Sequence, residues 1–116
     1  MTVAHHLLVD AYGCAGPLDD PEAIVAAMRA GAVAGRCEIR GEGVVRFVPH
    51  GVTATLVLAE SHVVVSTWPE HGTALIDVLL CTVDADPEAV WGAIAAVLAP
   101  SQVTRRLLVR GLEGPG

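Results

Sequence analysis

Three segments of alternating apolar residues follow one another in the middle of this chain, with only short links between them. Residues 52–60, "VTATLVLAE", place Val, Ala, Leu and Leu at every second position, which is the period of a β-strand. A run of valines follows in "SHVVVSTW", and after a turn at Pro69–Gly72 comes "TALIDVLLC" at 73–81. Links this short join antiparallel strands, because parallel neighbours need a long crossover. The centre of the chain is therefore predicted to be an antiparallel sheet.

Two helices are predicted from one repeated starting signal. Asp20 is placed as an N-cap before Pro21, and "AIVAAMRAG" then continues the helix, with Gly31 as its expected stop. The same "DPEA" tetrapeptide recurs at Asp86, and the second helix is expected to run to about Leu98. Two helices of this length can cover one face of the sheet.

Other strands are expected outside the central segments. They are placed at 5–12, at 33–40 before a "GEG" turn, at 44–51 and at 103–109, with a mobile tail after them. The predicted fold class is α+β, an antiparallel sheet with two helices packed on one face, in a single domain of residues 1–116. The second sheet face must meet solvent or a partner. Because 53% of the residues are hydrophobic, we expect a homodimer.

Composition excludes several classes of function. A formal net charge of −6 without a basic face argues against nucleic-acid binding. No apolar run approaches the roughly 20 residues that span a bilayer, and "MTVAHHLLVD" lacks the form of a signal peptide, so a cytoplasmic protein is expected. The three cysteines have no metal-binding spacing and are expected to be free thiols. His5 and His6 have no further ligands at useful spacing, so no metal is predicted.

The chain contains no lysine, since all seven basic residues are arginine. A pyridoxal phosphate enzyme holds its cofactor as a Schiff base on a lysine. This class of enzyme is therefore excluded.

The two ends of the central strand carry residues that a buried strand does not need. The motif consists of Glu60-Ser61-His62, Thr67-Trp68-Pro69-Glu70, Ala74, Asp77 and Cys81. In this order and spacing, it resembles the prokaryotic S-adenosylmethionine decarboxylase proenzymes. The opening "HHLLVDAYGC" is also similar to the first strand of that family. The resemblance extends over nearly the whole chain.

The resemblance implies that the chain cuts itself between Glu60 and Ser61. The Ser61 hydroxyl would attack the Glu60 carbonyl and turn the amide into an ester. Elimination would then leave a dehydroalanine, and hydrolysis would give a pyruvoyl group at the new N-terminus. The products would be chains of residues 1–60 and 61–116. A pyruvoyl carbonyl forms a Schiff base with a substrate amine and accepts electrons, which suits a chain without lysine.

The resemblance also assigns roles to other side chains. Cys81 would be the acid that returns a proton to the substrate carbon, because a thiol is protonated at neutral pH and able to donate. Phe47 and Trp68 match adenine-side aromatics, whose faces also suit a sulfonium cation. Glu70 would hold the ribose hydroxyls. The implied activity is decarboxylation of S-adenosylmethionine, which supplies spermidine synthesis.

The chain departs from the family pattern at two positions near Ser61. Ser66 stands where the family usually has a histidine that acts as the processing base, and Thr53 stands where it has a serine. Hydroxyls are poor bases beside imidazole. A regular strand also points Ser61 and Ser66 to opposite faces, so a bulge is required if both line one pocket.

Three interpretations remain open from these departures. In the first, another histidine does the base's work, with His50, His62 and His71 as candidates. In the second, the chain stays uncut and acts as a binding protein or interaction module without enzymatic activity. In the third, the same pyruvoyl chemistry serves another amine, such as arginine or ornithine.

Overall fold

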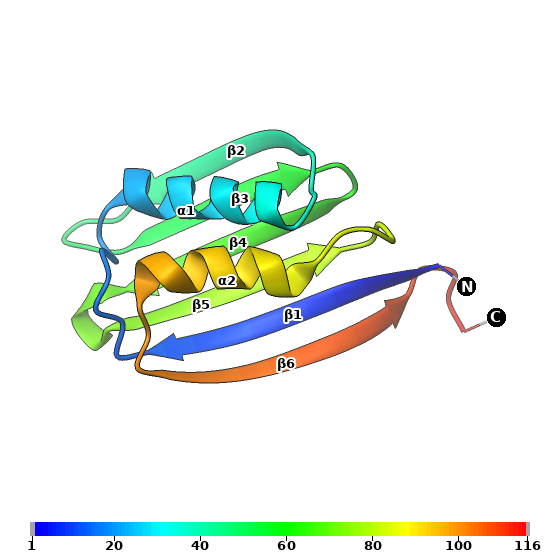
Figure 1. The fold of residues 1–116 in the computed structure, drawn as a ribbon. Coiled ribbons are helices and arrows are strands. Elements are labelled where there is room, and N and C mark those ends of the chain that lie inside the picture. The colour runs from blue at the N-terminus through cyan, green and yellow to red at the C-terminus, as the bar shows by residue number, and fades with distance from the viewer. Residues whose placement is uncertain (1, 116) are drawn as a thin grey trace.

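A computed structural model describes residues 2–115 and shows an antiparallel sheet covered on one face by two helices (Figure 1). In this part of the chain the strands are β1 (Val3–Tyr12), β2 (Ile39–Arg46), β3 (Val52–Leu58), β4 (Ser61–Trp68), β5 (Thr73–Leu80) and β6 (Gln102–Gly111). Their order across the sheet is β2-β3-β4-β5-β1-β6, and every neighbouring pair is antiparallel. The predicted fold class is confirmed.

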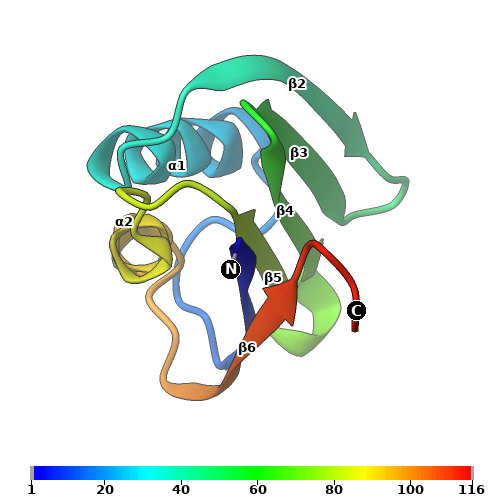
Figure 2. The same ribbon diagram turned by 90° about the vertical axis from the view of Figure 1, so that its right-hand side faces the viewer.

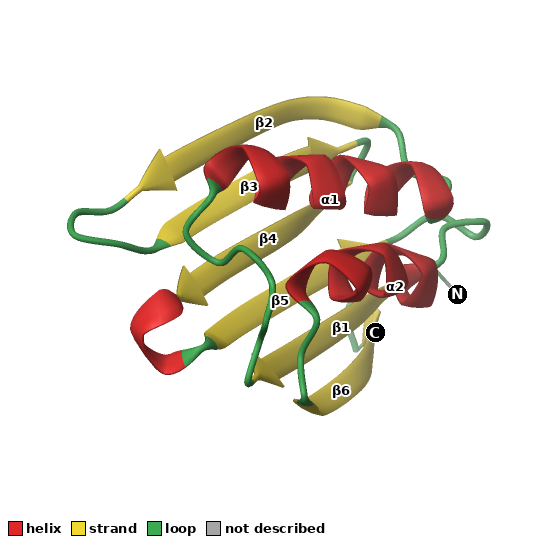
Figure 3. Cartoon of the chain, turned by 60° about the vertical axis from the view of Figure 1, so that its left-hand side comes forward, coloured by secondary structure: helices red, strands yellow, loops and turns green. Residues whose placement is uncertain are grey.

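The helices α1 (Pro21–Ala34) and α2 (Pro87–Leu98) lie side by side on the same face of the sheet (Figure 3). Both begin as predicted. The Asp20 carboxylate accepts the backbone N–H groups of Glu22 and Ala23 at 3.1 and 3.2 Å. Asp86 caps α2 with the same geometry. The side-chain cap and the following proline explain why local sequence located both starts.

The predicted stop of α1 at Gly31 and the strand at 33–40 were wrong, because α1 continues to Ala34. Gly31 is a packing residue, since a Cβ built there would lie 2.8 Å from the carbonyl oxygen of Val90 in α2. The glycine therefore lets the two helices approach each other and does not end the first one.

The "GEG" turn and the separate strand at 44–51 were also wrong. Residues 41–43 lie inside β2, which is an edge strand and has a register irregularity between Ile39 and Gly41. An edge strand tolerates two glycines because only one side pairs with a neighbour. The predicted tail begins later than expected, since β6 continues to Gly111.

The two faces of the sheet differ in burial. Side chains facing the helices form the core, which includes Leu7, Leu56, Val63, Val65 and Val78. The opposite face has no helix over it within residues 2–115, as the end-on view in Figure 2 shows. We call this the open face. It carries the even-numbered side chains of β4, which are half-buried or exposed.

Thr67 is the buried polar residue that ties the first loop to the sheet. Its hydroxyl donates to the Leu18 carbonyl oxygen at 2.7 Å and accepts the Val52 N–H at 2.9 Å. Replacing it with valine keeps the shape but leaves both backbone groups without this partner. We expect Thr67→Val to lower the free energy of unfolding by about 1–3 kcal/mol, measured by urea denaturation. Equal losses in Thr55→Val, on the open face of β3, would contradict this assignment.

Candidate active site

Glu60 and Ser61 lie at the tight turn between β3 and β4. Leu58 pairs with Ser61, so Ala59 and Glu60 are the only residues between the paired positions. Glu60 has φ 66°, in the left-handed region that residues with a side chain seldom adopt. Such a conformation costs about 1–2 kcal/mol. The Glu60–Ser61 peptide bond, at which the family resemblance implies cleavage, therefore follows a strained residue.

Cys81 completes a small cluster at this turn. The Ser61 hydroxyl lies 3.5 Å from the Cys81 sulfur, and the thiol donates to the Glu60 carbonyl oxygen at 3.2 Å. The thiol reaches this carbonyl because β4 and β5 are paired neighbours and Cys81 directly follows β5. A donor on the carbonyl oxygen withdraws charge from its carbon, where a nearby hydroxyl can attack. The structure thus brings together Glu60, Ser61 and Cys81.

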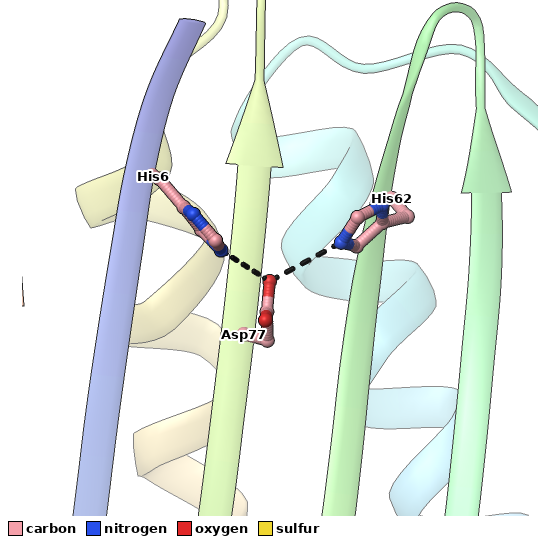
Figure 4. A group of neighbouring side chains, drawn as sticks. All are labelled: His6, His62 and Asp77. Atoms are coloured by element: carbon pink, nitrogen blue, oxygen red, sulfur yellow. Dashed lines mark hydrogen bonds and ion pairs between the residues drawn. The ribbon is translucent and has the colours of Figure 1, made fainter. Parts of the chain in front are cut away.

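A second cluster joins three strands on the open face (Figure 4). Asp77 of β5 lies between His6 of β1 and His62 of β4, and its Oδ1 is 2.8 Å from His6 Nε2 and 3.2 Å from His62 Nε2. The sequence interpretation missed this cluster. It treated His6 as a strand end without nearby ligands, because nothing local shows that β1 pairs with β5.

Arg110 indicates where the hydrogen of His6 lies. Its guanidinium lies 3.3 Å from His6 Nδ1, and arginine only donates, so Nδ1 must be the acceptor. The His6 hydrogen is then on Nε2 and points to Asp77. Although the three side chains come within 4.8 Å of one another and could in principle hold a metal ion, Nε2 has no free lone pair in this arrangement. The cluster is a hydrogen-bond chain that orients His62, the neighbour of Ser61.

The remaining predicted site residues lie toward the opposite end of β4. Thr53 and Ser66 face each other across β3 and β4, with their hydroxyl oxygens 3.1 Å apart. Trp68 is 39% exposed and, with Ser66 and Asp77, lines an open-face pocket of about 400 Å³. Glu70 follows in the short 3₁₀ helix η1 (Pro69–His71).

Phe47 and His50 are also at this end, in the connection from β2 to β3. Phe47 is 49% exposed. His50 Nε2 lies 3.4 Å from Glu70 Oε1, which links this connection to η1. The predicted adenine-side and ribose-side residues therefore share one end of the sheet.

The two ends of β4 are too far apart to act on one substrate within one chain. Pairing runs from Ser61 to Trp68 without a register shift, so the bulge required to bring Ser61 and Ser66 into one pocket is not formed. A rise of about 3.3 Å per residue places Ser61 and Trp68 roughly 23 Å apart. Of the candidate bases, His62 lies at the Ser61 end, whereas His50 and His71 lie at the other.

The other two cysteines have a structural environment. Cys14 and Cys37 pack against the core, and burial raises the pKa of both thiols. Both are free thiols, as expected.

The fold is that of a small α+β decarboxylase of known crystal structure, the adenosylmethionine decarboxylase from Aquifex aeolicus. The match has a TM-score of 0.84 and 28% sequence identity and covers 99% of this chain and 96% of the other. The S-adenosylmethionine decarboxylase family profile matches residues 5–111.

Two similar curated proteins carry the same description. An S-adenosylmethionine decarboxylase proenzyme from Thermoanaerobacter sp. (strain X514) is 35% identical over 111 residues, covering 95% of this chain and 90% of the relative. One from Pyrococcus horikoshii is 39% identical over 113 residues, covering 97% and 81%. This chain belongs to the S-adenosylmethionine decarboxylase family. No helix in residues 2–115 is long and apolar enough to cross a membrane.

Proposed function

We propose that this protein decarboxylates S-adenosylmethionine with a pyruvoyl group made from its own Ser61. The observation that carries the proposal is the contact of the Ser61 hydroxyl, the Cys81 thiol and the Glu60 carbonyl at a strained turn. Family membership supports S-adenosylmethionine as the substrate. It does not favour arginine, ornithine or a binding role without chemistry.

Self-cleavage starts from the geometry at the β3–β4 turn. The Ser61 oxygen attacks the Glu60 carbonyl carbon, the C–N bond breaks, and an ester links the two residues. The Cys81 thiol lies where it stabilises the negative charge on the carbonyl oxygen. Elimination from this ester removes the Cα proton of residue 61 and breaks its Cβ–O bond, which releases residues 1–60 with a terminal carboxylate and leaves a dehydroalanine. Water then displaces its nitrogen as ammonia, and residue 61 becomes the pyruvoyl terminus. The left-handed conformation of Glu60 is relieved when the chain opens, which favours cleavage.

The residues around position 61 fit a pyruvoyl group. When formed, this group accepts the electrons left by departing CO₂, which no lysine-bound cofactor can do in this chain. Cys81 remains beside residue 61, at the end of β5. We assign Cys81 the role of donating the proton that replaces CO₂ on the substrate carbon. His62, held by Asp77, fixes the strand that follows the new terminus.

A homodimer completes the site in this proposal. Trp68 lies roughly 23 Å from Ser61 in one chain, farther than a nucleoside joined to an amino acid can reach. Glu70 follows Trp68 at the same end of the sheet. A second copy packed on the open face by a two-fold axis brings its own opposite end to the β3–β4 turn, where Ser61 begins β4. The open face can bury such a copy because it exposes large apolar side chains, among them Val45, Val57, Leu75 and Leu108.

The same arrangement gives position 66 a role in cleavage. Ser66 of one copy would approach the β3–β4 turn of the other, which holds the Glu60–Ser61 bond, and an imidazole there is a far better base than a hydroxyl. Ser66→His is expected to raise the rate of self-cleavage by about 10²-fold. The measurement is the disappearance of intact chain after cell-free synthesis. Thr55→His is the control, because Thr55 lies in β3 on the same open face of the sheet as Ser66. This variant should leave the rate unchanged. An unchanged rate in Ser66→His would contradict the placement of Ser66.

The substrate is tested by CO₂ release from carboxyl-labelled compounds. We expect turnover of S-adenosylmethionine and none of arginine or ornithine. The result is corrected for the fraction of cleaved chain, so that slow self-cleavage is separated from slow catalysis. Turnover of arginine or ornithine alone would replace the proposed substrate.

A further inference from the structure

Asp19 lies in the loop before α1, and its carboxylate joins both ends of the connection between β2 and β3. Its Oδ2 accepts from the Arg46 guanidinium at 2.7 Å, and its Oδ1 accepts the Gly51 backbone N–H at 2.8 Å. Arg46 is the last residue of β2, and Gly51 directly precedes β3. One side chain therefore holds the two ends of the segment 47–50, which carries Phe47.

The segment 47–50 is closed on itself as well. The Phe47 N–H donates to the Gly51 carbonyl oxygen at 2.8 Å. Gly51 has φ 112°, which L side chains rarely adopt, and a Cβ there would lie 3.3 Å from the Thr67 carbonyl oxygen. The position of Phe47 thus depends on the backbone of Gly51, and Gly51 is held by Asp19.

Asp19 itself projects from a fixed part of the chain. The preceding residue, Leu18, is 5% exposed, and its carbonyl oxygen accepts the buried Thr67 hydroxyl. Two hydrogen bonds lower the pKa of the Asp19 carboxyl. The bond from the Gly51 N–H has the larger effect, and the bond from the Arg46 guanidinium follows it. The carboxylate therefore stays ionised at neutral pH and links a rigid loop to the segment 47–50.

We propose that Asp19 is a positioning residue for substrate affinity, because it holds Phe47 where the adenine side of the substrate binds. This inference rests on the proposed function, together with the family resemblance that makes Phe47 an adenine-side aromatic. Asp19 does not touch the reacting atoms. Its loss should weaken binding without slowing the chemistry, so that KM rises while kcat is unchanged.

The kinetic test compares Asp19→Ala, Asp19→Asn and the control Asp84→Asn, which removes an exposed carboxylate from the loop before α2. We expect Asp19→Ala to raise KM for S-adenosylmethionine about tenfold, with kcat and the extent of self-cleavage unchanged. Asp19→Asn keeps an acceptor for the Gly51 N–H but lacks the negative charge that faces the Arg46 guanidinium. Its KM should therefore lie between those of the wild type and Asp19→Ala. Asp84→Asn should match the wild type.

A second readout does not need the processed enzyme. In the uncut Ser61→Ala protein, hydrogen exchange of the Phe47 and Gly51 amides should accelerate when Asp19 is also replaced by alanine. Exchange in β4 and β5 should stay the same. This pattern separates a loosened segment from general destabilisation.

The pH dependence of stability gives a third readout. Because the folded pKa of Asp19 is lowered, its contacts stabilise the fold above the ordinary carboxyl pKa and are lost as pH falls through the folded pKa. Asp19→Asn should therefore be less stable than the wild type at pH 7. The difference should shrink as the pH falls below the ordinary carboxyl pKa and vanish once the pH lies below the lowered folded pKa of Asp19.

The outcomes separate this inference from the proposed function. If the wild type turns over S-adenosylmethionine but Asp19→Ala leaves KM and amide exchange unchanged, the positioning role is wrong. If kcat, self-cleavage and melting temperature all fall together, Asp19 is only a structural residue and the inference is also overturned. If the cleaved wild type itself does not act on S-adenosylmethionine, the proposed function is what fails.

Discussion

Replacing Cys81 with alanine is expected to lower kcat for decarboxylation by about 10²- to 10⁴-fold. The thiol lies beside residue 61 and is the group that we assign to protonate the substrate carbon. The measurement is CO₂ release per cleaved chain, because the same thiol contacts the Glu60 carbonyl oxygen and its loss should also slow self-cleavage.

Cys37→Ala is the matched control for this prediction. Cys37 is a partly buried free thiol that packs against the core, and the pKa of its thiol is raised by burial alone. The Cys37→Ala protein should lose some stability and keep the kcat of the wild type. A Cys81→Ala protein that is fully cleaved and retains kcat within a few-fold of the wild type would remove Cys81 from the mechanism.

The second large effect is the recovery of activity from two inactive proteins. Ser61→Ala lacks the cleavage residue, and the double variant Trp68→Ala/Glu70→Ala lacks the substrate residues at the opposite end of the sheet. In a mixed dimer, one site combines the intact Ser61 end with the intact Trp68 end. Random mixing makes about half of the dimers hybrids, and each hybrid has one intact site of its two. The activity of the unsorted mixture should therefore return to about a quarter of the wild-type value.

The control mixture combines Ser61→Ala with Cys81→Ala. Both residues lie at the same end of the sheet, so every site in the hybrid is defective and no activity should return. Co-expression with two different affinity tags isolates the hybrids before the assay, and the purified hybrids of the first mixture should then have about half of the wild-type activity. Hybrids of the first mixture that remain inactive would show that the two ends do not meet across copies.

Local chemistry explains which parts of the fold could be predicted. The starts of α1 and α2 follow from Asp20 and Asp86, whose carboxylates accept N–H groups two and three residues later. The end of α1 could not be predicted from Gly31. A glycine at this point is typical of a helix end, but here it lies inside the helix and packs against α2. That contact is with α2, which lies far away in sequence.

The candidate site shows the same division between local and distant information. The family resemblance implied that Ser61 and Cys81 share one site, and a single pairing of β4 with β5 is enough to bring them together. The contact of His6 with Asp77 depends on β1 lying between β5 and β6, which no local pattern encodes. The sequence alone shows that Ser61 and Ser66 point to opposite faces of a regular strand. It does not show whether the strand between them is regular.

The intact mass of the freshly purified protein under denaturing conditions tests the central claim most directly. We predict two chains that divide between Glu60 and Ser61, with the second beginning in a pyruvoyl group. A single species at 12.0 kDa would contradict it. The contact of Ser61, Cys81 and Glu60 would then be a structural turn, and the protein would have to act without a cofactor made from its own chain.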